Sequence, residues 1–225
     1  MSLVILAQFL ALALAASLGL SVYRRLRATQ ARRAAAFEDF AMGRGLQVYR
    51  SAVSAPVYRL SDDSGTVITV ETAPASRLPF GAPRKGGVVT IALPLPRLPR
   101  GLVALVAGVE AGAPDRGTRL DRALRGLNAG GERVALRVLP LAGAVALLAD
   151  VPAEATPDLE AMRTALAHPA LRPDARGTAM IALNADGLHL RLGRSLGDAR
   201  DLGPILDAMQ ALAARLQPGA RRRAA

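Results

Sequence analysis

The apolar segment Leu3–Val22 is the most distinctive hydrophobic pattern in the chain. Its twenty positions carry no charge, and only one glutamine and two serines interrupt the apolar side chains. An α-helix of that length is about 30 Å long, which matches the hydrocarbon thickness of a bilayer. Arginines follow the segment at once. The pattern predicts a single transmembrane anchor over residues 1–23.

Helix-forming residues continue from Tyr23 to Met42, without glycine or proline, and glycines follow. This composition predicts that the anchor extends into a basic juxtamembrane helix over residues 24–43. Phe37 and Phe40 are three positions apart, so they lie near one face of that helix. We expect the two aromatic rings to dock the helix onto the folded domain.

Short β patterns follow. Residues 57–60 and 66–72 flank the turn-forming sequence Asp62-Asp63-Ser64-Gly65, and this arrangement predicts a hairpin. A second hairpin is predicted over 178–183 and 188–192, where leucines alternate with His189 and Arg191. Further predicted strands cover residues 88–93, 102–107, 134–139 and 143–150. Alanine and leucine in the last of these also fit a helix.

Three helices are predicted among these strands. The first covers residues 118–127. The second has Thr156-Pro157 as its N-cap and first position and directs Leu159, Met162 and Leu166 inward, ending at His168. The third is amphipathic and spans residues 202–216.

Together the elements indicate an α+β fold: an N-terminal transmembrane helix followed by one mixed domain of antiparallel hairpins with packed amphipathic helices. Residues 44–216 are enough for one hydrophobic core, and we expect them to form a single domain that folds independently of the anchor. Residues 217–225 are expected to form a disordered basic tail.

The net charge of +11 is concentrated at two places. Three arginines lie in the tail, and five lie just after the apolar segment: Arg24, Arg25, Arg27, Arg32 and Arg33. Removing these eight leaves +3 for the rest of the chain. Aromatic residues make up only 3% of the sequence and tryptophan is absent, which disfavours base stacking and a nucleic-acid partner.

The same arginines predict the topology. A cleaved signal peptide is the alternative, because Ala13-Leu14-Ala15 resembles a cleavage site, but a signal peptide carries its charge before the apolar run. The positive-inside rule instead places the N-terminus outside and the domain in the cytoplasm of a bacterial inner membrane. The absence of cysteine is consistent with a reducing compartment.

No sequence motif indicates catalysis. The chain has two histidines, His168 and His189, and neither has acidic or histidine partners at metal-ligand spacing. The glycine-rich segment 81–87 lacks the order of a phosphate-binding loop, and residues 126–131 follow a predicted helix, the reverse of a dinucleotide fingerprint. We therefore expect a protein that is not an enzyme and that needs no cofactor.

The candidate site residues are those of the membrane boundary. Tyr23 stands where an interfacial aromatic residue belongs, and the five juxtamembrane arginines can bind anionic lipid or simply fix the topology. The sequence favours an accessory or assembly factor that contacts membrane protein partners. The alternatives are a membrane-tethered binder of nucleic acid or anionic ligand through the arginine clusters, and an enzyme without a recognisable motif.

Overall fold

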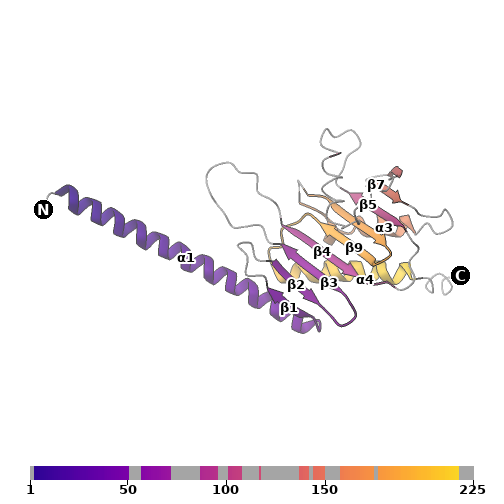
Figure 1. Cartoon of the computed structure of the whole chain (residues 1–225), viewed down its shortest axis with the longest axis horizontal. Coiled ribbons are helices and arrows are strands. Elements are labelled where there is room, and N and C mark those ends of the chain that lie inside the picture. Colours follow the sequence, from indigo (N-terminus) through magenta and orange to yellow (C-terminus); the bar gives the residue numbers. More distant parts are fainter. Residues whose placement is uncertain are drawn as a thin grey trace.

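The computed structural model describes residues 3–50, 57–71, 87–95, 101–107, 117, 137–141, 144–149, 158–174 and 177–217. Within these ranges the chain forms one long N-terminal helix, a nine-stranded antiparallel sheet and two further α-helices (Figure 1). The predicted α+β class is confirmed.

The N-terminal helix α1 is continuous from Leu3 to Gly43. It ends where the glycines follow: the amide of Gly45 donates to the carbonyl of Met42, and the amide of Leu46 donates to that of Ala41 at 2.9 Å. This Schellman pairing requires a left-handed residue, and Gly45 has a φ of 66°. The predicted extension of the apolar helix into the basic segment, and its glycine stop, are both confirmed.

All nine strands belong to one sheet, in the order β1-β2-β3-β4-β9-β8-β5-β7-β6. Their bounds are β1 Gln47–Arg50, β2 Val57–Ser61, β3 Val67–Glu71, β4 Val88–Leu93, β5 Leu102–Ala107, β6 Arg137–Leu141, β7 Ala144–Ala149, β8 Ala179–Asn184 and β9 Gly187–Leu192. Strand β7 settles the helix-or-strand alternative for residues 143–150.

Both predicted hairpins are present. In the β2–β3 turn, Asp62 Oδ1 accepts hydrogen bonds from the Thr66 amide at 2.8 Å and the Ser64 hydroxyl at 2.7 Å. In the β8–β9 turn, Asn184 Oδ1 accepts from the amides of Asp186 and Gly187. These short side chains satisfy the turn backbone locally, which is why the turns can be recognised in the sequence.

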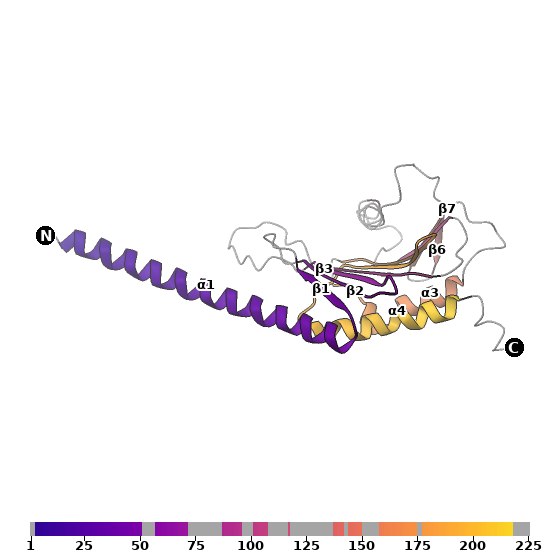
Figure 2. The ribbon, with the colours of Figure 1, turned by 60° about the horizontal axis from the view of Figure 1, so that its bottom comes forward.

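The other two α-helices, α3 (Leu159–Leu166) and α4 (Leu202–Leu216), lie on the same face of the sheet (Figure 2). The 3-10 turns η2 (Pro169–Leu171) and η3 (Ala199–Asp201) connect to them. The apolar positions predicted for α4 face the sheet: Leu202, Ile205, Leu206, Met209 and Leu212 are buried, and Leu216 packs at the edge of the core.

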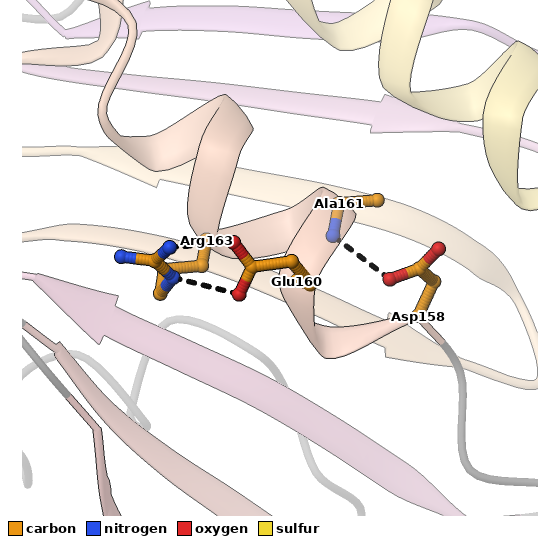
Figure 3. Close-up of polar contacts among 4 residues, drawn as sticks. All are labelled: Asp158, Glu160, Ala161 and Arg163. Atoms are coloured by element: carbon orange, nitrogen blue, oxygen red, sulfur yellow. Dashed lines mark hydrogen bonds and ion pairs between the residues drawn. The ribbon is translucent and has the colours of Figure 1, made fainter.

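The predicted start of α3 was wrong. Asp158, not Thr156, is its N-cap, because Asp158 Oδ1 accepts a hydrogen bond from the Ala161 amide at 3.0 Å (Figure 3). Glu160, in the first turn of α3, forms an ion pair with Arg163 (Figure 3). The predicted helix over 118–127 and the tail after Gln217 lie outside the described residues, as does the start of the strand predicted over 134–139.

The C-terminal turns of α1 contribute directly to the domain core. Ala34, Phe37 and Ala41 belong to the same buried cluster as the sheet, and Phe37 is only 3% exposed. Its ring stacks on Tyr58 of β2, with centroids 4.4 Å apart and planes 21° from parallel. The expected docking by Phe37 is confirmed, and Phe40 packs at the edge of the cluster. One unbroken helix thus joins the apolar segment to the core.

Candidate functional site

The part of α1 before Ala34 is a free-standing stalk. Every residue from 7 to 33 is exposed, and this part of the helix projects away from the sheet (Figure 1). Among the described residues, α1 is the one helix long and apolar enough to cross a membrane by length and composition. Its exposed apolar side chains, including Phe9 at 64% and Leu12 at 72%, have no protein covering in the described part of the chain. A lipid environment would solvate them.

The five candidate arginines line this stalk without forming one cluster. At 1.5 Å per residue, Arg24 to Arg27 lie about 3–8 Å beyond Val22, whereas Arg32 and Arg33 lie about 15 Å beyond it. The polar layer of a bilayer is about 5–7 Å thick on each side. With residues 3–22 in the hydrocarbon layer, the first three arginines would lie close to the headgroups. The last two stand near the domain.

Tyr23 is 58% exposed at the boundary between the apolar and basic parts of α1. Its ring is free to lie at the height of the headgroups, as an interfacial tyrosine does. The membrane-interface role assigned to it and the lipid-binding role assigned to the arginines both stay predictions.

Arg32 and Arg33 border a small hollow of about 190 Å³ between α1 and the segment that leads into η3. Phe37 lies on the helix side of this hollow and Asp198 on the other. The Asp198 carboxylate is already used, because Oδ1 accepts from the Arg200 amide at 3.1 Å in a capping box with Asp201. The hollow marks the junction between stalk and domain.

A larger groove of about 480 Å³ lies between α3 and α4, on their outer side. Four alanines line it: Ala161 and Ala165 from α3, and Ala208 and Ala211 from α4. Buried Leu212 belongs to the same wall. Because alanine side chains are short, the backbones of both helices are accessible along the groove.

Polar side chains also line this groove along its length. Asp207 lies near the start of α4, where the guanidinium of Arg44 donates to both carboxylate oxygens, at 2.7 and 3.3 Å. These hydrogen bonds hold the pKa of Asp207 below its usual range. Arg215 lies two turns further along α4 and makes no ion pair with a described residue. Thr164 and His168 line the α3 side.

Sequence reasoning missed this groove. The helical pattern of α4 identified its apolar face toward the sheet, but the alanines on the outer face were not distinguished from a solvated surface. The sequence did contain one sign of the groove: Asp207, Ala211 and Arg215 are spaced four residues apart and therefore lie on one face of the helix. Which residues lie opposite them on α3 depends on tertiary packing.

The two histidines have different structural roles. His168 caps η2: its Nδ1 accepts a hydrogen bond from the Ala170 amide at 3.2 Å. His189 lies on β9, half-buried, with Nε2 3.0 Å from Asn184 Oδ1, an acceptor that assigns the proton to Nε2. Burial lowers the pKa of His189, and the charge of Asp186 opposes this shift only in part.

His189 therefore predicts a pH dependence of stability. Because its folded pKa lies below its unfolded value of about 6.5, the unfolded chain binds more protons, and stability is lost as the pH falls through this range. The free energy of unfolding of the detergent-solubilised protein should decrease from pH 7.5 to 5.5. His189→Gln should show a shallower slope, because it removes the group whose pKa is lowered by burial. Identical slopes for the two proteins would contradict the assignment.

Within the described ranges, no three histidine, aspartate or glutamate side chains gather as a potential metal site. The described residues do offer a helix of membrane-spanning length, a packed junction between this helix and the domain, and an alanine-lined groove.

Comparison with known proteins finds a similarity to a solved structure. No family model matches the chain, and neither does any curated protein. Among solved structures, the chain is similar to the crystal structure of the mycobacterial trehalose monomycolate transport factor A, TtfA. The identity is 14% and the TM-score 0.40, over 83% of this chain and 95% of that one. At this level of similarity, the comparison defines no function.

Proposed function

We propose that this chain is a single-pass membrane protein with a cytoplasmic domain, acting as an accessory or assembly factor through contacts with membrane protein partners. The observation that supports this most is the continuity of α1, which runs without a break from the apolar segment to Phe37 in the core. A helix without internal glycine or proline between residues 23 and 42 transmits orientation as well as attachment.

The length of α1 sets the distance between the membrane and the domain. From Val22 to Gly43, α1 is about 30 Å long. Arg44, at the end of the helix, pairs with Asp207 at the start of the α3–α4 groove. With α1 close to the membrane normal, the groove begins about 30 Å from the hydrocarbon layer, well beyond the headgroups. A surface at that distance is better placed to contact the cytoplasmic part of a membrane protein than to contact lipid.

The proposed role is not catalytic, in keeping with the scarcity of histidine and the absence of cysteine from the sequence. Binding of nucleic acid by the arginines is less well supported. Along α1 the arginines are divided between headgroup height and the domain junction, so they present no continuous basic surface.

Site-specific photo-crosslinking in intact cells tests the proposal. Lysine-directed reagents suit this chain poorly because Lys85 is its sole lysine. A photoreactive residue is instead placed at exposed positions on three elements: Glu38 of α1, Tyr49 of β1 and Ala211 of α4. We expect adducts with an integral membrane protein from at least one position, and their loss when residues 1–23 are deleted. The absence of protein adducts from all three would contradict the proposed function.

A further inference from the structure

We propose that the α3–α4 groove binds an amphipathic helix of a partner protein and that this helix places an acidic side chain against Arg215. The inference rests on the proposed function and names the surface and the chemistry of the contact.

The shape of the groove favours a helix. A helix packs against others at interaxial distances of about 8–10 Å, and small side chains at the contact permit the closer approaches. Ala161 and Ala165 are one turn apart on α3, and Ala208 and Ala211 are one turn apart on α4. They form two short ridges between which the apolar side chains of a third helix can insert, as in other helix-in-groove complexes.

The charges along the groove indicate which charge its occupant carries and at which end. The Asp207 carboxylate is neutralised by two hydrogen bonds from Arg44. Arg215 is exposed and has no charged partner among the described residues. The uncompensated charge of the groove is therefore positive and lies at its far end, so a partner with a carboxylate at that end is complementary.

A second copy of the chain is a poor occupant. In both views, α4 begins beside the end of α1 and runs away from the N-terminus (Figures 1 and 2). Two copies in one membrane share the direction of α1, so a two-fold axis relating them lies along the membrane normal. Pairing through the groove would then align the α4 helices in parallel and place Arg215 near its own counterpart.

The C-terminal tail is also a poor occupant, for reasons of charge. It carries Arg221, Arg222 and Arg223, which Arg215 would repel. An acidic helix from another protein is the occupant that the groove favours.

The test compares photoreactive residues at two adjacent positions of the full-length chain in intact cells. Ala211 lines the groove, whereas Gln210 is exposed on α4 outside the groove lining. We expect at least fivefold more protein adduct from position 211. Mass spectrometry should map this adduct to a partner segment that combines apolar residues at helical spacing with aspartate or glutamate.

Charge variants then test the role of Arg215. Arg215→Glu should reduce the adduct from position 211 at least fivefold, because it places like charges opposite each other. Arg215→Lys should retain most of it. Arg200→Glu is the matched control: Arg200 is also exposed but lies on η3, away from the groove, and its reversal should have little effect.

The inference would be overturned by equal adducts from positions 210 and 211 or by no effect of Arg215→Glu. An adduct mapped to a second copy, to the chain's own tail or to lipid alone would also overturn it. Adducts with a membrane protein from Tyr49 or Glu38 but not from Ala211 would overturn the groove inference and leave the proposed function intact. No protein adduct from any position would overturn both.

Discussion

A chain that begins at Gly43 is expected to lose its cooperative unfolding transition and to aggregate. The deletion removes Ala34, Phe37 and Ala41 from the core and leaves the ring of Tyr58 without its stacking partner. Loss of a buried phenylalanine side chain alone costs about 3–5 kcal/mol, which is a large part of the roughly 5–15 kcal/mol that stabilises a typical domain. Circular dichroism during heating measures the transition.

A chain that begins at Ala28 is the matched control, because it lacks the apolar anchor but retains every buried residue of α1. It should remain soluble and unfold in one transition. Similar transitions for the two fragments would show that residues 44–216 fold without the stalk, as the sequence led us to expect. Phe37→Ala in the full-length chain should reproduce most of the destabilisation.

Gly187→Ala is expected to destabilise the domain by about 3 kcal/mol, from backbone strain and overlap together. Gly187 opens β9 with a φ of 143°, which a residue with a side chain rarely adopts. A Cβ at this position would also overlap the carbonyl oxygen of Leu93 and come within 3.1 Å of Pro94 Cα. Both contacts are with backbone atoms, and these atoms cannot move aside without disturbing β4.

Gly45→Ala provides the comparison for this prediction. Gly45 also has a positive φ, of 66°, but nothing lies within 4 Å of a Cβ added there. Its replacement should cost only the conformational penalty, about 1 kcal/mol. Chemical denaturation of both variants measures the difference, and equal losses would show that the close approach to Leu93 has little energetic effect.

The parts of this fold that sequence reasoning identified are those determined by neighbouring residues. Asp62 and Asn184 satisfy their own turns, and the period of α4 places its leucines on one side. The order of the strands was not accessible in the same way. Strand β5 pairs with both β8 and β7, which are distant in sequence, and such pairings depend on the whole core rather than on a local pattern.

Two smaller discrepancies have the same origin. Strand β1 was not predicted, because Gln47, Tyr49 and Arg50 are exposed and lack an apolar alternation; the strand forms by pairing with β2 at the edge of the sheet. The α3–α4 groove was not predicted because its two walls come from helices that are distant in sequence. The role of the stalk arginines stays a prediction, and their spacing along α1 follows from the continuous helix.

The most direct test of the central claim is the membrane topology of the intact chain. Because the sequence contains no cysteine, single cysteines can be introduced without background. Ser2→Cys and Ser61→Cys variants, in spheroplasts, are exposed to a maleimide that cannot cross the membrane. We expect Ser2→Cys to react in intact spheroplasts and Ser61→Cys to react only after permeabilisation, with both proteins resisting alkaline extraction from the membrane. Reaction of Ser61→Cys in intact spheroplasts, or release of the protein by alkali, would contradict a single-pass anchor with a cytoplasmic domain.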